Sequence, residues 1–182
     1  MLFNLFGKKV ETSSEQLFLD KTYITGDAKM NAIVLLAKET EDKVFIAWFP
    51  DTITFYKDLF LKNNLNENRI RDARHFHSSQ LNNAIPVFLE HHPLHSKETE
   101  LVKNWPPAQL VVYNALEEPL FKQFGSDKII SLIKMLGMKN EEAIEHELVS
   151  RSILRAQDKI AAKVTVEMNA NSQQEWIEKN LK

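Results

Sequence analysis

The sequence contains no cysteine and only four glycines, Gly7, Gly26, Gly125 and Gly137. Without cysteine, the chain forms no disulfide, no zinc–thiolate site and no thiol nucleophile. Loops that bind phosphate need closely spaced glycines, because successive backbone N–H groups must point at the anion. Glycines this far apart form neither a GxxxxGK nor a GxGxxG motif. The sequence therefore excludes a self-sufficient ATPase or nucleotide-driven motor, and we predict no cofactor.

An excess of charge of one sign and long apolar runs are missing as well. The 23 basic and 25 acidic residues leave a net charge of −2, which gives no overall field to attract nucleic acid or an anionic membrane. The longest apolar runs, such as Val44–Pro50, are far shorter than the roughly 20 residues of a membrane span. No signal-peptide cleavage site follows Met1–Phe6. We expect a globular protein of the cytoplasm.

The first part of the chain predicts an α/β domain over residues 15–125, after a flexible leader over residues 1–14. Strands are predicted over Lys43–Phe49, Arg69–Phe76, Ile85–Glu90 and Leu110–Asn114. Helices are predicted over Asp27–Glu39, Thr52–Leu65 and Ser96–Lys103. In the second helix Phe55 and Leu59 are expected to point inward, with Tyr56 and Phe60 as further candidates. Strands that alternate with helices indicate a sheet of about four strands, mostly parallel.

Residues 126–182 predict a helical extension. Ser126 is a suitable N-cap for a helix over Asp127–Leu136, and Gly137 stands where a left-handed residue ends a helix. A long helix is predicted over Glu147–Val164, and Ser172 is the expected cap of a last helix over Gln173–Leu181. The long helix has an apolar stripe and, on another face, the basic residues Arg151, Arg155 and Lys159.

The stretch Leu110–Lys163 contains motifs in an order that resembles one protein family. An aromatic strand runs through a Glu-Glu turn into Phe124-Gly-Ser126, and Met135-Leu-Gly-Met138, Ala143-Ile-Glu-His146 and a Ser-Arg-Ser-Ile-Leu-Arg-Ala-Gln segment follow. This stretch is similar to the end of the second nucleotide-binding domain and the start of the helical scaffold of SecA, the bacterial preprotein translocase ATPase. Ala28-Lys29 and Asp72–His75 resemble earlier parts of that domain more loosely. The resemblance implies a RecA-like domain half.

The departures from the family pattern concern its ATP site. The family has a Gly-Arg-Gly-Thr-Asp run and a Gln-x-x-Gly-Arg-x-Gly-Arg run in this domain, and the second supplies arginines to the phosphoryl group. This chain passes from Phe76 to Ile85 without the first, and Lys103–Pro107 stands in place of the second. An arginine finger accounts for roughly 10³–10⁵ in rate. No ATP-site residue of the family can therefore be assigned to a position here, and we predict a chain that is not an enzyme.

Five histidines, which are His75, His77, His91, His92 and His95, fall close together in the sequence. Three imidazoles with a carboxylate such as Glu90 suit zinc, nickel or copper, so a small metal-dependent enzyme is one alternative. Histidines that only hydrogen-bond, or that lie at the surface, are the preferred interpretation.

Two features suggest contact with another protein. Trp105 lies beside Pro106 and Pro107, where a tryptophan is difficult to bury and suits a docking anchor. The stripe Arg151, Arg155 and Lys159 suits an acidic partner, although it is also typical of a solvated helix face. We predict a non-catalytic SecA-like binding or regulatory module with a secretion component or an unfolded preprotein as partner. A subunit that completes a split ATP-binding motor with another chain is a further alternative.

Overall fold

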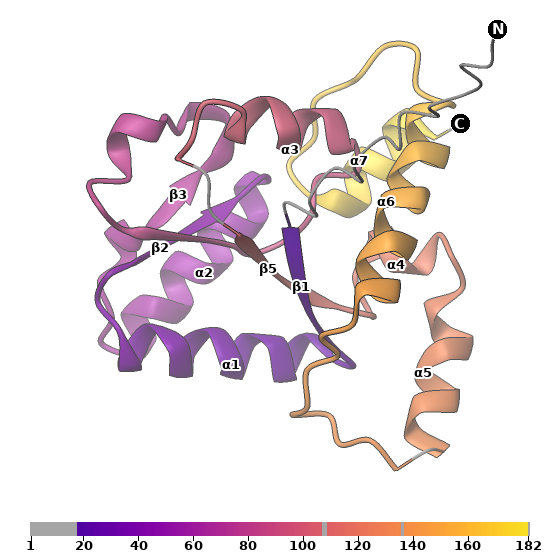
Figure 1. Cartoon of the computed structure of the whole chain (residues 1–182), viewed down its shortest axis with the longest axis horizontal. Coiled ribbons are helices and arrows are strands. Elements are labelled where there is room, and N and C mark those ends of the chain that lie inside the picture. Colours follow the sequence, from indigo (N-terminus) through magenta and orange to yellow (C-terminus); the bar gives the residue numbers. More distant parts are fainter. Residues whose placement is uncertain (1–17, 107–108, 136, 182) are drawn as a thin grey trace, which may run out of the picture.

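The computed structural model describes residues 18–106, 109–135 and 137–181 of the chain. Strands and helices alternate in the first part as β1 (Phe18–Tyr23), α1 (Gly26–Glu39), β2 (Lys43–Ala47), α2 (Pro50–Lys62), β3 (Ile70–Asp72), β4 (Ile85–Phe88), α3 (His95–Val102) and β5 (Leu110–Ala115). The helices α4 (Pro119–Lys122), α5 (Ser126–Met135), α6 (Glu147–Ala161) and α7 (Gln173–Asn180) follow (Figure 1). The predicted leader, residues 1–14, lies outside the described residues, as do Pro107 and Leu136.

The five strands form one parallel sheet in the order β1-β5-β4-β2-β3. The predicted α/β fold with a parallel sheet is confirmed, and the arrangement fits a RecA-like half. The sequence does not predict β1, because Asp20, Lys21 and Thr22 interrupt its apolar character. The predicted strand Arg69–Phe76 is wrong beyond Asp72. The carboxylate of Asp72 accepts a hydrogen bond from the backbone N–H of Arg74 (2.9 Å), which starts a 3₁₀ turn.

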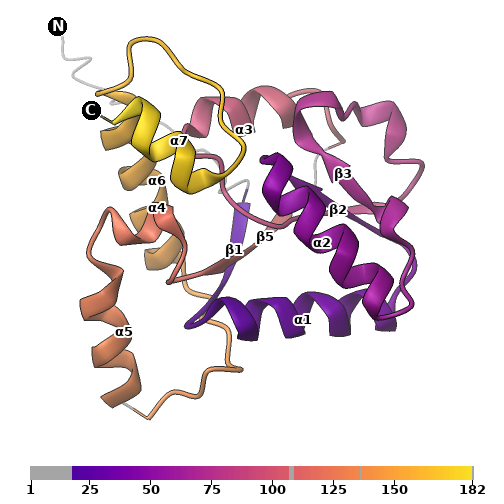
Figure 2. The same ribbon diagram turned by 180° about the vertical axis from the view of Figure 1, so that it is seen from behind.

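Each face of the sheet is covered by helices. On one face, α1 and α2 pack against Phe45, Val87 and Tyr113. On the other, α3, α4, α6 and α7 pack against a second core that includes Phe88 and Val112 (Figures 1 and 2). Successive side chains of a strand point to opposite faces, so one set of strands supplies both cores.

In α2 the inward side chains differ from those predicted. Tyr56 and Phe60 are buried, whereas Phe55 is 51% exposed, which corrects its expected inward position. The helix begins at Pro50, and the proline occupies the first turn, where its missing N–H costs no helical hydrogen bond.

Of the helices after residue 125, α6 and α7 pack on the same sheet. Ile153 and Ile160 of α6 and Trp176 of α7 belong to the core on the second face. The apolar stripe predicted for α6 is confirmed, although the helix ends at Ala161 rather than Val164. Gly137 has a φ of +81°, as expected of a residue that ends a helix. None of the helices in the described ranges combines the length and the apolar character that crossing a bilayer requires.

Candidate functional site

A cavity lies at the edge of the sheet where β1, β2, β4 and β5 end. Open α/β sheets bind ligands at this carboxyl edge, because loops and helix N-termini meet there. The cavity has a volume of about 430 Å³ and is lined by residues from the start of α1, α2 and α7. Its charged lining residues are Asp27, Lys29, Asp51, Glu90 and Glu118. We call it the strand-end cavity.

Glu90, two residues after β4, accepts hydrogen bonds at the N-terminus of α2, beside this cavity. Its carboxylate accepts hydrogen bonds from the backbone N–H groups of Trp48 (3.0 Å) and Phe49 (3.2 Å) and from the hydroxyl of Thr52 (2.8 Å). Phe49 directly precedes α2, so the carboxylate occupies the anion position at the positive end of that helix. Burial raises the pKa of Glu90 to about 7, against the opposing effect of the Lys29 ammonium.

Two neighbouring glutamates after β5, Glu117 and Glu118, contact the first turn of α1. The backbone N–H of Gly26, the first residue of α1, donates to the carboxylate of Glu117 (2.9 Å). The Lys29 ammonium is buried, pairs with Glu118 (2.5 Å) and donates to the backbone carbonyl of Leu89. Burial alone lowers the pKa of a lysine, but the Glu118 carboxylate outweighs this effect and raises the pKa of Lys29. The chain's own carboxylates thus occupy positions that suit phosphate oxygens in α/β folds.

His91 is buried in a charged network between the sheet and the helices α3 and α6. Its ring lies between the carboxylates of Asp20 (2.6 Å from Nε2) and Glu98 (2.8 Å from Nδ1). Burial opposes the charge on the imidazole, but the Glu98 and Asp20 carboxylates raise the pKa of His91 well above its usual value. The side-chain amides of Asn114 and Gln157 donate to the same two carboxylates (2.7 and 2.9 Å). The network joins β1, β5, α3 and α6.

The other histidines of the predicted cluster separate in space. His92 is buried against Phe49 and Trp176, and its Nδ1 accepts from the backbone N–H of Leu94 (3.0 Å). His95 is half-buried, 3.3 Å from Glu98. His75 and His77 are exposed and follow β3, the strand at one edge of the sheet.

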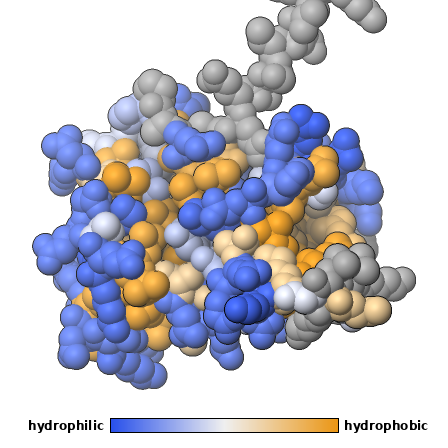
Figure 3. Space-filling view, turned by 60° about the horizontal axis from the view of Figure 1, so that its bottom comes forward, coloured by the Kyte–Doolittle hydropathy of each residue, from blue (hydrophilic) through white to orange (hydrophobic). Residues whose placement is uncertain are grey.

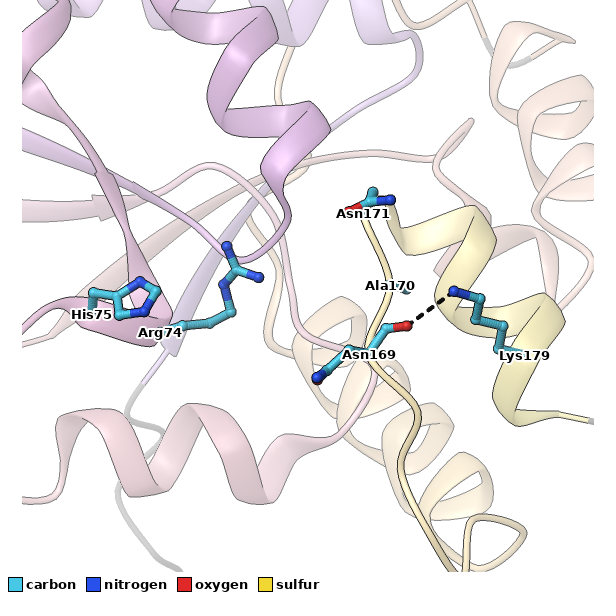
Figure 4. Close-up of a pocket in the computed structure, with 6 residues that line it drawn as sticks. All are labelled: Arg74, His75, Asn169, Ala170, Asn171 and Lys179. Atoms are coloured by element: carbon cyan, nitrogen blue, oxygen red, sulfur yellow. Dashed lines mark hydrogen bonds between the residues drawn. The ribbon is translucent and has the colours of Figure 1, made fainter.

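His75 lines a small cavity of about 390 Å³ with Arg74 (Figure 4). Asn169, Asn171 and Lys179 form its opposite side, and Lys179 donates to the carbonyl of Asn169 (3.1 Å). In the part of the chain that the structure describes, no three histidine, aspartate or glutamate side chains are arranged to hold a metal ion.

A second cavity of about 430 Å³ is an open groove between α4, α5 and α6. Its lining is mostly apolar, with Leu116, Leu120, Phe121, Phe124, Ile129, Ile133, Met138, Ile144, Leu148, Val149, Ile153 and Ala156. Ile129 is 45% exposed and Leu148 is 62% exposed. Figure 3 shows the face where α1 and α5 lie, with apolar patches between polar side chains. We call this cavity the apolar groove.

The two serines that line the apolar groove have no free hydroxyl hydrogen. Ser126 donates to the carbonyl of Leu116 (2.6 Å), and Ser152 donates to the carbonyl of Leu148 (2.7 Å). Ser126 is the first residue of α5 and directs its hydroxyl to this carbonyl, outside the helix. The described side chains of the groove therefore offer an occupant apolar contact and almost no hydrogen bonding.

The basic residues of α6 lie at the border of the apolar groove. Residues three or four positions apart are neighbours on a helix, so Arg151 and Arg155 adjoin Leu148 and Ser152. Arg151 pairs with Glu147, while Arg155 and Lys159 are exposed. The predicted acidic partner for this stripe remains a prediction.

Trp105 is half-buried rather than extended into solvent. Its ring stacks on Phe88 (6.0 Å between centroids) and meets Phe76 edge-on (5.7 Å). These contacts hold the indole against the core of the second face. Its role as a docking anchor remains a prediction.

Sequence reasoning missed both the role of Glu90 and the groove. Glu90 ends the predicted strand Ile85–Glu90 and precedes two histidines, so it was considered only as the carboxylate of the alternative metal site. The available signal was its position after a buried strand, where side chains reach the ligand edge of a parallel sheet. The groove has a weaker signal, which is the large number of apolar residues between Leu116 and Ala156.

No protein-family model matches the chain, and the similarities to known proteins cover short stretches of it. A 49-residue stretch, 27% of the chain, is 51% identical to the Protein translocase subunit SecA of Ehrlichia canis. A 54-residue stretch, 30% of the chain, is 43% identical to the Protein translocase subunit SecA 1 of Alkaliphilus metalliredigens. A 51-residue stretch is 43% identical to the same subunit of Acinetobacter baumannii.

These matches are similar in length to Leu110–Lys163, the stretch that contains the SecA-like motifs. Each match spans only 6% of the relative's own length. The resemblance is therefore confirmed for a segment, and the chain contains a SecA-related segment of about fifty residues.

Proposed function

Because the chain contains a SecA-related segment, we propose that it is a non-catalytic binding or regulatory module that acts in protein translocation. The relatives are named as subunits of a protein translocase. The single observation that carries the proposal is the apolar groove, whose lining residues all fall between Leu116 and Ala156, within the stretch of SecA-like motifs. The module binds an apolar part of another protein in this groove.

The energetics of the groove favour such a partner. Ile129 and Leu148 remain largely exposed, and the hydroxyls of Ser126 and Ser152 are already engaged. Water in the groove gains few hydrogen bonds from these walls, and removing apolar surface from water is favourable. Each Leu- or Phe-sized side chain that becomes buried contributes about 1.5–3 kcal/mol.

The non-catalytic part of the proposal is supported by the strand-end cavity. Glu90 and Glu117 already accept the N–H groups at the start of α2 and α1. A triphosphate would compete with these carboxylates and would also meet Asp27 and Asp51. Like charges in one cavity repel, so the cavity disfavours nucleotides.

The proposed partner is a secretion component or an unfolded preprotein in the cytoplasm. A module with this groove competes with a full-length translocase motor for its partner, because both present the same kind of segment. Regulation then follows from the relative amounts of module and motor.

Capture of partners from the native cytoplasm tests the proposal. The immobilised wild-type chain is expected to retain a translocation component or a preprotein, and Leu148→Gln is expected to retain less. Leu35→Gln is the matched control, because Leu35 is 58% exposed on α1, outside the groove. Equal recovery by both variants, or recovery of no such protein by the wild type, contradicts the proposal.

Calorimetric titration with Mg–ATP tests the non-catalytic part separately. No binding heat and no phosphate release are expected, with or without the captured partner. Turnover that appears only with a partner chain would instead indicate a subunit of a split motor. Turnover that a substitution in the strand-end cavity abolishes would make the chain an enzyme.

A further inference from the structure

We propose that the occupant of the apolar groove is an amphipathic α-helix of the partner, with acidic residues along the flank that faces α6. This inference rests on the proposed function, since it takes the groove to be a protein-binding site. It then distinguishes a partner segment that binds as a helix from one that binds as an extended chain.

The walls of the groove decide between a helix and an extended segment. The groove runs between α4, α5 and α6, whose backbone groups bond mostly within the helices. An extended segment would bring a row of backbone N–H and C=O groups that find no partner on such walls. Each such group, once buried, costs about 1–3 kcal/mol. A helix satisfies its own backbone and presents only side chains.

The hydroxyl groups of the groove do not change this conclusion. Ser126 and Ser152 direct their hydrogens to the carbonyls of Leu116 and Leu148. The remaining described lining side chains are apolar. An apolar helix stripe therefore matches the groove better than a backbone does.

The lengths of the walls set the length of the occupant. The long wall, α6, has 15 residues, and α5 has 10. At 1.5 Å per residue these helices are about 22 and 15 Å long. A partner helix of about three to four turns spans this distance, with apolar residues at i, i+3, i+4 and i+7.

Charge at the border of the groove selects the flank of the partner helix. Arg155 and Lys159 are exposed next to the Leu148 side, while Arg151 is already paired with Glu147. Glutamate or aspartate on the facing flank of the occupant forms ion pairs with these two cations. Exposed ion pairs are weak individually, so they fix orientation and partner choice more than affinity.

Three synthetic peptides of about 16 residues test the inference. The first has a leucine stripe at helical spacing with glutamates on one flank. The second has lysines in place of those glutamates. The third keeps the composition of the first but has two central prolines, which prevent a helix. Binding is measured by fluorescence anisotropy, and helix formation on binding is measured by circular dichroism.

The glutamate peptide is expected to bind tightest and to gain helicity when it binds. The proline peptide is expected to bind at least tenfold more weakly, and the lysine peptide two- to fivefold more weakly. The double variant Arg155→Glu/Lys159→Glu is expected to reverse the preference between the glutamate and lysine peptides. Lys62→Glu, an exposed lysine at the end of α2, is the control and leaves the preference unchanged.

Two outcomes overturn the inference. If the proline peptide binds as tightly as the glutamate peptide, the groove takes an extended chain. If the double variant leaves the ratio of the affinities for the glutamate and lysine peptides unchanged, the basic residues of α6 do not select the charge of the partner helix. In both cases, if Leu148→Gln weakens the binding of the peptides, the proposed function still holds. If none of the peptides binds and capture from the cytoplasm also fails, the proposed function fails as well.

Discussion

The strand-end cavity and the apolar groove have the same volume, about 430 Å³. They differ in whether the side chains that line them have partners within the chain. In the strand-end cavity, buried charges find partners within the chain, as Glu90 does at α2 and Lys29 at Glu118. In the apolar groove, exposed side chains such as Leu148 lack a covering element in the described structure. The cavity contributes to stability, whereas the groove is available for binding.

This contrast separates two surfaces of one fold. The carboxyl edge of the sheet is the general ligand site of open α/β folds. In this chain, glutamates of the edge cap the helices that would otherwise hold an anion. The apolar groove lies elsewhere, between helices that follow the sheet. The proposed binding function therefore requires no change at the strand ends.

The largest effect is expected from Lys29→Met, which breaks the charge balance of the strand-end cavity. The substitution leaves Glu118 partly buried without its ammonium partner, which costs about 3–5 kcal/mol of unfolding free energy. Urea denaturation measures the change. Leu148→Gln, in the groove, is expected to stay within about 0.5 kcal/mol of the wild type. Similar losses for the two variants would remove the distinction between the two cavities.

Glu90→Gln tests the same cavity through pH. The pKa of Glu90 is raised from the usual 4.5 to about 7 in the folded chain. A carboxyl group with a raised folded pKa contributes stability below the unfolded pKa, and this contribution is lost as the pH rises through about 7. The lost contribution is at most about 3 kcal/mol.

Because glutamine does not ionise, Glu90→Gln is expected to gain stability relative to the wild type between pH 4.5 and pH 8. Its amide oxygen can still accept from the N–H groups at the start of α2. Urea denaturation at several pH values measures the difference, and Glu141→Gln, an exposed residue outside the cavity, is the control. A constant difference across this pH range would show that Glu90 is ionised as easily as an exposed glutamate.

A smaller change in stability than those of Lys29→Met and Glu90→Gln is expected from Glu117→Ala. The exposed carboxylate of Glu117 accepts only the N–H of Gly26 among the hydrogen bonds of the described residues. Loss of a cap of this kind costs about 0.5–1 kcal/mol. Thermal unfolding monitored by circular dichroism detects the change, with Glu141→Ala as the reference. A loss as large as that of Lys29→Met would mean that Glu117 also supports the buried pair beside it.

Sequence patterns predicted the parts of this fold that depend on local periodicity. The strands β2, β4 and β5 are apolar runs, and the apolar stripe of α6 recurs at helical spacing, so both are visible in the chain itself. β1 is not visible, because its buried Asp20 finds its partners, His91 and Asn114, far away in the sequence. The prediction of which α2 side chains point inward was wrong at Phe55, because the four aromatic and apolar residues considered there fit more than one face of the helix.

The candidate site was less predictable for the same reason. Hydrogen bonding was the preferred interpretation of His91, but its partners were not predictable, because Asp20 and Glu98 meet its ring only after the sheet and α3 are assembled. The apolar groove depends on how α5 and α6 diverge, which no spacing in the chain specifies. The SecA-like motifs, in contrast, were found directly, because their order along the chain is their signal.

The pairing of β1 with β5 has a consequence for synthesis on the ribosome. Phe18 faces Leu110, so the first strand meets its neighbour in the sheet only after nearly all of the α/β part has been made. At about 5–20 residues per second, this wait lasts on the order of 5–20 s. During that time Asp20 and Lys21 keep charges on an unpaired strand, which discourages pairing with other nascent chains. The polar residues that made β1 difficult to predict from the sequence thus also protect it until β5 has been synthesised.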